Sequence, residues 1–320
     1  MDGVGEPALL IEGSTSPHSF TLKPSHAKLL EEADIIFWVG ESIETFMERP
    51  LESIVKNAEV VEFMEVESIN KLKFREESIF EDHDDHDDHD DHDDHDDHDD
   101  HDDHDDHDDH DDHDDHDDHD DHDDHDDHDD HDDHDDHDDH DDHSGHDHHG
   151  HAHGEFDAHI WLDPMNAKEM VHEIAHELGD LDPANKNKYE ANAQATIQAL
   201  DQLVNDIEKG INKDAKFVVF HDAYQYFEER FGVRAAGALT LNTDVLPGAK
   251  QIADIQDVIK DRGIKCIFSE PQFNPKIITT IAEDMNIKTG VFDPLGANID
   301  SNKDLYFKLI QNLGNELKGC

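Results

Sequence analysis

The chain has 320 residues, and its 86 Asp and Glu against 24 Lys and Arg give it a formal net charge of -62. Residues 82–143 hold 41 of the Asp and neither Lys nor Arg, which leaves 45 acidic and 24 basic residues elsewhere. An acidic surface repels nucleic acid and anionic membranes, so both are excluded as partners. Because no run approaches the ~18 apolar residues of a membrane span and no signal-peptide pattern opens the chain, we expect a soluble protein without membrane insertion.

The first part of the chain alternates short apolar runs with helical spacing, which is typical of α/β layers. The run Ile35–Val39 is apolar throughout, as in a strand buried on both faces of a parallel sheet. We expect strands at residues 8–12, 35–39 and 60–63, and helices beginning near Pro24 and covering residues 43–55.

An unbroken Asp-Asp-His repeat runs from His83 to His143. A tract without apolar residues cannot offset the entropy lost on folding, so we predict disorder over residues 82–153. In an extended polyproline II conformation every His would lie on one edge, and we predict loose, auxiliary metal capture by the tract without a fixed geometry. A second cluster adds five imidazoles: His146, His148, His149, His151 and His153. The alternative is a solvated linker.

After the tract, residues 157–164 read as a buried strand that carries His159, and residues 164–179 as an amphipathic helix. Residues 172–176, His-Glu-Ile-Ala-His, fit the HExxH pattern of zinc proteases, in which both His and the Glu face a cleft. Here His172, Glu173 and His176 lie opposite the apolar stripe, as on a solvated helix face. A zinc hydrolase therefore remains an alternative only.

The remainder predicts a long helix over residues 184–209 and then a second α/β unit. Its strands are expected at residues 216–220, 233–239, 265–268 and 288–292, and its helices after Tyr224 and at residues 249–260, 275–284 and 303–317. The fold class is thus α/β, with two Rossmann-like lobes joined by a long rigid helix. The expected domains are residues 1–183 with the disordered insertion 82–153, the linking helix 184–209 and residues 210–320.

Polar residues collect where the predicted strands end. His18 lies in a loop after a strand, His159 in a strand, and His221 and Asp293 follow the carboxyl ends of strands. This is the edge at which open α/β sheets bind ligands. Three neutral imidazoles with one further donor suit Zn²⁺ in a tetrahedral site, so we predict a metal between the two lobes.

The two cysteines, Cys266 and Cys320, lack a CxxC spacing and do not form a metal site. From the sequence pattern they are either two reduced thiols or one disulfide that ties down the C-terminus.

A set of motifs in a fixed order resembles the metal-binding solute-binding proteins of ABC transporters, most closely the zinc-uptake, ZnuA-like type. The resemblance covers nearly all residues outside the tract, and a His- and acid-rich loop before the second ligand is a mark of the zinc members. The motifs are residues 16–18 (SPH), 22–25 (LKPS), 33–40 (ADIIFWVG), 159–164 (HIWLDP), 220–224 (FHDAY), 270–273 (EPQF) and 293–296 (DPLG).

The resemblance implies that His18, His159 and His221 are zinc ligands. Asp293 matches the carboxylate that completes the site in manganese-type relatives, so it is expected as a fourth ligand or as a partner that orients one. Some zinc members carry a Glu before the first His, and Pro17 stands there in this chain. The family also pairs cysteines in the C-terminal lobe, which implies a disulfide between Cys266 and Cys320 and an oxidising compartment.

Family members begin with a signal peptide, a first strand and most of a first helix, and we expect this chain to lack them. The resemblance implies a periplasmic, monomeric, non-enzymatic protein that captures Zn²⁺, with Mn²⁺ as the less favoured ion, and delivers it to an ABC transporter permease. A metal buffer acting through the His and Asp tract is the third hypothesis. Imidazoles bind metal only when deprotonated, so zinc binding should weaken below about pH 6.

Overall fold

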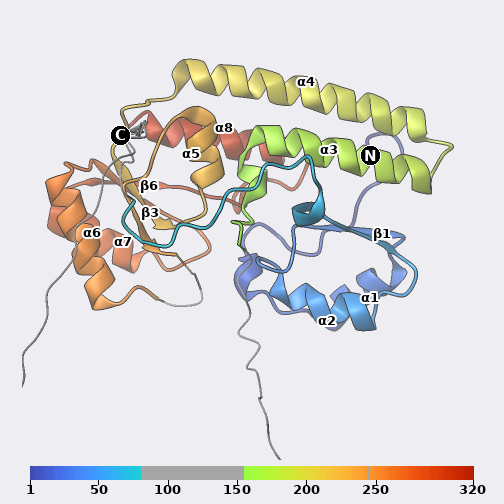
Figure 1. Ribbon diagram of the computed structural model, residues 1–320, viewed down its shortest axis with the longest axis horizontal. Helices are drawn as coiled ribbons and strands as arrows, with labels where there is room; N and C mark the ends of the chain where they lie inside the picture. The colour runs from blue at the N-terminus through green and yellow to red at the C-terminus, as the bar shows by residue number, and fades with distance from the viewer. Residues whose placement is uncertain (81–154, 242, 244–245) are drawn as a thin grey trace, which may run out of the picture. The chain divides into compact units, whose positions relative to one another are not determined.

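The computed structural model describes residues 1–80 and 155–320, apart from residues 242, 244 and 245. Within these residues the predicted α/β class is confirmed: two parallel sheets are covered by helices (Figure 1). The expected disorder of residues 82–153 lies outside this part of the chain. None of the described helices is long and apolar enough to cross a membrane.

The first sheet has two parallel strands, β1 and β2, in a register that pairs Ile35 with Glu59. Leu30, Ile36, Trp38 and Met47 form a small apolar cluster beside it. The elements of this part, in chain order, are η1 (Pro17–Ser19), α1 (Pro24–Glu32), β1 (Ile35–Trp38), η2 (Thr45–Met47), α2 (Glu48–Ser53), β2 (Glu59–Glu62) and η3 (Phe63–Glu65).

Two predictions for this part were wrong. Residues 8–12 form no strand, because their backbone pairs with no described strand and only Leu10 joins the apolar cluster, while Leu9 is 58% exposed. The helix predicted over residues 43–55 is divided into η2 and the short α2. Pro50 lies in the first turn of α2, and a longer helix would press its ring against the carbonyl four residues earlier.

The second sheet has four parallel strands in the order β4-β3-β5-β6. Side chains of β3 alternate between two apolar cores, with Phe217 and Val219 in one and Val218 and Phe220 in the other, so the strand is buried along its length. The strands are β3 (Phe217–His221), β4 (Ala238–Thr240), β5 (Cys266–Ser269) and β6 (Lys288–Val291). The strand expected at residues 233–239 is shorter and begins later, at Ala238, and Gly237 just before it forms an isolated antiparallel bridge with Ile79 of the preceding chain.

Helices cover both faces of this sheet (Figure 1). α6 and α7 pack on one face, and α4, α5 and α8 contribute to the core on the other. Their bounds are α4 (Lys186–Gly210), α5 (Gln225–Phe231), α6 (Ala249–Asp261), α7 (Lys276–Met285) and α8 (Leu305–Leu317). The bounds of α4, α6, α7 and α8 lie within about two residues of the predicted ones, and α5 follows Tyr224 as expected.

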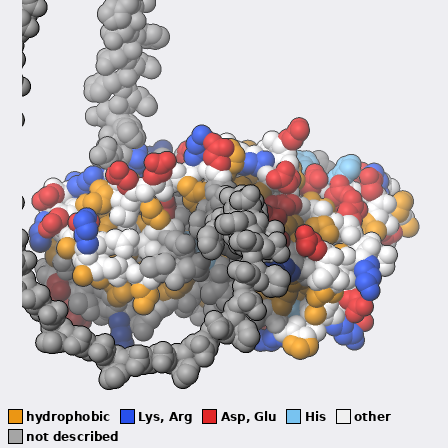
Figure 2. All heavy atoms as spheres, turned by 60° about the horizontal axis from the view of Figure 1, so that its bottom comes forward, with side chains coloured by type: hydrophobic (Ala, Val, Ile, Leu, Met, Phe, Trp, Pro, Cys, Tyr) orange, Lys and Arg blue, Asp and Glu red, His pale blue; other side chains and the backbone are white. Residues whose placement is uncertain are grey.

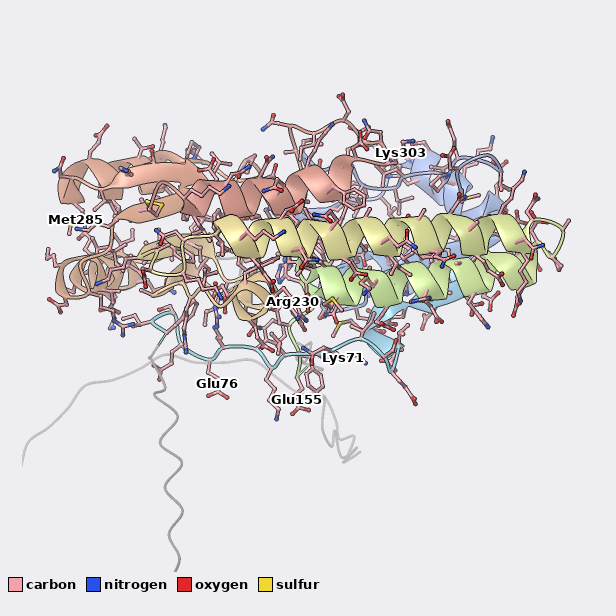
Figure 3. All side chains as sticks on the ribbon, turned by 90° about the horizontal axis from the view of Figure 1, so that it is seen from above. Lys71, Glu76, Glu155, Arg230, Met285 and Lys303 are labelled. Atoms are coloured by element: carbon pink, nitrogen blue, oxygen red, sulfur yellow. A yellow bond between two sulfur atoms is a disulfide. The ribbon has the colours of Figure 1, made fainter. Side chains whose placement is uncertain are left out.

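Two long helices, α3 (Pro164–Leu181) and α4, lie side by side (Figures 1 and 3). Asp163 caps α3 by accepting a hydrogen bond from the Met165 N–H, and Pro164 occupies the first turn, where its missing N–H costs nothing. The 25 residues of α4 span about 37 Å at 1.5 Å per residue. α4 therefore packs against α3 and also against α8, beside the second sheet.

Residues 66–80, which we call the strap, run without regular structure from η3 to the edge of β4 (Figure 3). Near its middle the strap pairs with the chain that returns from the tract. Lys73 bridges Phe156, the Asp157 N–H donates to the Leu72 carbonyl at 2.8 Å, and the Leu72 N–H donates to the Tyr226 hydroxyl at 2.9 Å. These bonds fix the position of the residues that lead to His159.

The strand predicted over residues 157–164 was wrong. Residues Ile160–Leu162 form a 3-10 turn, η4, in which the Leu162 N–H donates to the His159 carbonyl at 3.1 Å. Ile160 and Leu162 are completely buried, and α3 begins directly after the turn. No described strand pairs with residues 158–164, and the N–H groups of Leu162 and Asp163 instead donate to carbonyls three residues earlier.

Candidate metal centre

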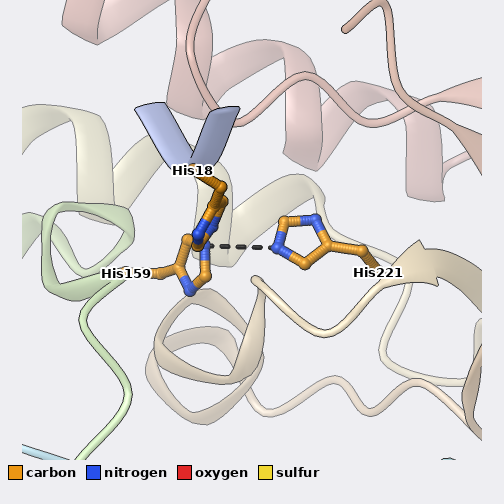
Figure 4. A group of neighbouring side chains, drawn as sticks. All are labelled: His18, His159 and His221. Atoms are coloured by element: carbon orange, nitrogen blue, oxygen red, sulfur yellow. Dashed lines mark hydrogen bonds between the residues drawn. The ribbon is translucent and has the colours of Figure 1, made fainter. Parts of the chain in front are cut away.

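Three histidines from separate parts of the chain meet at one point (Figure 4). His18 lies in η1, His159 immediately precedes η4, and His221 is the last residue of β3. One ring nitrogen from each lies within 4.8 Å of the others, and these are the three histidines that the sequence predicts as ligands. His159 and His221 are 5% and 4% exposed, while His18 is half-buried.

The spacing of the rings suits a tetrahedral ion. His159 Nε2 and His221 Nε2 are 3.3 Å apart. Bonds of 2.0–2.1 Å from zinc to imidazole nitrogen give a regular tetrahedron an edge of about 3.3–3.4 Å. The His18 ring lies 5.5 Å from the His159 ring and 5.8 Å from the His221 ring, between centroids. Two of the three nitrogens therefore already have the separation that a shared zinc ion requires.

Buried carboxylates orient two of these rings. Asp157 is fully buried, and its Oδ1 lies 2.6 Å from His159 Nδ1 and accepts the His159 backbone N–H at 2.9 Å. Glu270, directly after β5, contacts His221 Nδ1 with both oxygens, at 2.9 and 3.1 Å. A carboxylate can only accept, so each Nδ1 carries the proton and each Nε2 keeps a lone pair that points to the other rings.

The electrostatics around His221 are dominated by opposing effects. Burial favours the neutral ring and lowers its pKa, but the charge of Glu270 and its hydrogen bond outweigh burial, so the pKa of His221 lies above its usual value. Next to it, burial raises the pKa of Asp222 to about 7, although Arg75 opposes this rise. The Arg75 guanidinium donates to Asp222 at 2.8 Å and to Glu228 at 2.6 Å, which anchors the strap beside the site.

The three rings line a cavity of about 10 Å³, comparable to the space of one water molecule. Trp161 closes one side: its ring centroid is 5.3 Å from that of His159, and its indole N–H donates to the Pro294 carbonyl at 2.8 Å. The other lining residues are Ser16, Pro17, Ile43, Glu270, Gln272, Phe273 and Leu295.

Asp293 follows β6, as predicted, but its side chain stabilises a turn. Its carboxylate accepts the backbone N–H groups of Leu295, Gly296 and Ala297 and the Gln272 amide, at 2.6 to 3.1 Å. It is not among the residues whose ligand atoms converge with the three histidines. These bonds fit a role in supporting the loop that carries Pro294 and Leu295.

The remaining predicted residues lie elsewhere. His172 and His176 of the HExxH segment are exposed on α3, and His176 Nδ1 contacts Glu177 at 3.0 Å. Cys266 and Cys320 form the expected disulfide. The auxiliary tract histidines, from His83 to His153, lie outside the described residues.

Sequence reasoning missed three polar residues of the centre. It assigned no role to Asp157, although an acid two residues before a ligand histidine was a usable signal. It quoted Glu270 and Gln272 only as part of a motif. The contact of Glu270 with His221 could be predicted only from the strand order, because β3 and β5 are neighbours and end at the same edge of the sheet.

Three comparisons place the chain among known proteins. A family model described as zinc-uptake complex component A, periplasmic, matches residues 1–320. The high-affinity zinc uptake system protein ZnuA of Brucella abortus is 45% identical over 322 residues, which cover 100% of this chain and 86% of the relative.

Two solved structures share the fold. A mutant of the laminin-binding adhesin Lmb of Streptococcus agalactiae aligns with a TM-score of 0.62 at 22% identity, over 96% of this chain and 90% of that chain. A crystal structure of ZnuA aligns with a TM-score of 0.62 at 19% identity, over 97% of this chain and 89% of that chain.

Proposed function

This chain belongs to the family of zinc-uptake complex component A, and we propose that it captures one Zn²⁺ at His18, His159 and His221 and delivers it to an ABC transporter permease. The observation that carries the proposal is the meeting of three imidazoles whose Nε2 atoms include a pair 3.3 Å apart. Zinc is the cargo in this proposal, so the protein binds and releases the ion without a covalent reaction. The Brucella abortus relative, named for high-affinity zinc uptake, supports the same ion.

Membership of this family also supports a compartment and a partner. The family description is periplasmic, and the disulfide between Cys266 and Cys320 suits an oxidising compartment. The protein works there as a monomer, and its partner is the permease of a zinc-uptake system. Figure 2 shows carboxylates scattered among basic side chains on the visible face, and the net negative charge of the chain draws cations rather than anions to it.

Delivery requires that the site open. The division into lobes at residues 1–183 and 210–320, joined by α4, is supported by the two separate sheets and by the length of α4. His18 and His159 belong to the first lobe and His221 to the second. Trp161 and Tyr306 tie the lobes beside the site, since the Tyr306 hydroxyl donates to the Trp161 carbonyl at 2.8 Å. Because a helix linker permits less hinge motion than flexible strands, release would depend on small shifts of the packed lobes.

Two other functions find less support. A zinc hydrolase working through His172, Glu173 and His176 needs a cleft, but both histidines are on an exposed helix face. A metal buffer acting through the tract alone does not explain why buried carboxylates contact His159 and His221. Neither alternative accounts for the convergence of three ligand nitrogens.

The test is a zinc titration of the full chain against a competing chelator strong enough to mask the tract. His159→Ala should abolish the tight site, while the matched change His172→Ala, at an exposed histidine of α3, should leave it intact. Removal of residues 82–153 should also leave one tight zinc. If tight binding survives His159→Ala and disappears with the tract, the tract is the receptor and the proposal fails.

A further inference from the structure

The three histidines of the proposed zinc site leave the fourth corner of the metal's tetrahedron without a protein ligand, and the role of Gln272 that we infer rests on that site. Carboxylates near the site are already engaged. Glu270 directs both oxygens at His221 Nδ1, and the Asp293 carboxylate accepts four N–H donors. The side chain of Pro17, which precedes the first histidine, has no atom that can bind a metal.

Gln272 lines the same cavity as the three histidines. Its amide nitrogen donates to the Gly13 carbonyl at 2.9 Å and to Asp293 Oδ1 at 3.0 Å. Both partners can only accept, so the amide cannot be flipped: the nitrogen must face them and Oε1 must face away. The orientation of this side chain is thus fixed by the chemistry of its neighbours.

Gln272 Oε1 is buried and has no hydrogen-bond partner among the described residues. A buried carbonyl oxygen without a donor costs free energy, and such an atom in a native protein calls for a missing partner. The cavity that Gln272 lines has space comparable to one water molecule. A water bound to a divalent cation is a strong donor, because the ion withdraws electrons from its O–H bonds.

We propose that Gln272 is a positioning residue that accepts, through Oε1, a hydrogen bond from a water molecule that completes the coordination of the captured metal. The protein then supplies three neutral nitrogens and holds the fourth ligand indirectly. A direct bond from an amide oxygen to zinc is the less suitable arrangement, because zinc sites use nitrogen, sulfur and carboxylate ligands. The site accordingly favours a fourth ligand that donates a hydrogen bond over one that only accepts.

Azide separates a bound water from other arrangements, because it replaces water on a metal but offers no proton to Gln272. The probe is the full chain loaded with one equivalent of Co²⁺, whose visible spectrum reports the fourth ligand. Azide should change the spectrum of the unaltered chain. Gln272→Leu should bind azide about three- to tenfold more tightly, since a carbonyl lone pair no longer faces the anion. The same substitution should weaken zinc binding about tenfold.

The control is Gln202→Leu, at an exposed glutamine of α4, which should change neither affinity. A purely structural role for Gln272 predicts azide binding that is unchanged or weaker, and this result would overturn the proposal. The proposal would also be overturned if azide left the cobalt spectrum of the unaltered chain unchanged. This measurement does not depend on the folding of any variant. A cobalt spectrum that persists in His159→Ala would instead overturn the three-histidine site itself.

Discussion

Asp157→Asn tests whether a carboxylate behind the ligand sets the affinity for zinc. Asp157 Oδ1 serves the Nδ1 and the backbone N–H of His159, while Oδ2 accepts the Gln225 amide at 2.6 Å. All three partners are donors, so an Asn amide must turn one N–H group toward another N–H group whichever way it is placed. When that N–H group faces His159, the ring loses the fixed tautomer that presents Nε2, and when it faces the Gln225 amide, the ring is left with a neutral amide oxygen in place of the charged carboxylate.

Loss of such an outer partner typically weakens metal binding 10- to 100-fold, which is about 1.4 to 2.7 kcal/mol. The assay is competitive zinc titration of the folded variant, with circular dichroism to confirm the fold. Asp201→Asn provides the control, because it removes the same charge at a half-exposed residue of α4 whose partner is Lys168. An affinity within twofold of the unaltered chain, in a folded Asp157→Asn protein, would refute the argument that this carboxylate positions His159.

Three further predictions concern protons and stability. Glu270 raises the pKa of His221 against the effect of burial, and an imidazolium ring cannot bind zinc. Competition by protons should therefore begin above the ordinary imidazole pKa of about 6.5, and the affinity for zinc should fall as the pH falls. An affinity at pH 5 equal to that at pH 8 would contradict this prediction. Arg75→Leu leaves two buried carboxylates unpaired and should lower the free energy of unfolding in urea by about 3–5 kcal/mol. Lys73→Leu removes an exposed ion pair of the same strap and should leave the free energy of unfolding almost unchanged. Cys320→Ser removes the disulfide that joins residues 54 positions apart and should lower the free energy of unfolding by about 4 kcal/mol. Under reducing conditions the variant and the unaltered chain should be equally stable, which is the check.

Helices with a long apolar stripe were predictable because their spacing repeats over many residues. α3 and α4 carry such stripes, and both lie within about two residues of the predicted bounds. β3 was equally clear, since a run buried on both faces is apolar at every position. The segment at residues 157–164 was not, because Ile160 and Leu162 share a face in a strand and are equally buried in a 3-10 turn. Only the absence of a partner edge in the described part of the chain decides between them.

The three histidines proposed as ligands could be found from the sequence, but the residues that support them could not. His221 follows an apolar run, and ligands collect at the carboxyl ends of parallel strands. The contact between His221 and Glu270 joins residues 49 positions apart and depends on β3 lying next to β5, an order that one sequence does not contain. The orientation of Gln272 likewise depends on Gly13, which is more than 250 residues away.

The position of charge in this site favours zinc over manganese. The side chains that would face the ion in the proposed site are imidazoles, and the carboxylates of Asp157 and Glu270 lie behind two of them. Imidazole suits zinc, whereas manganese prefers carboxylate oxygens and binds nitrogen ligands more weakly. Asp293, the carboxylate that resembles the manganese-type ligand, would have to give up hydrogen bonds from three backbone N–H groups and from Gln272 to reach a metal. That loss falls on manganese alone, because zinc is held by the three imidazoles and a bound water and needs no bond from Asp293.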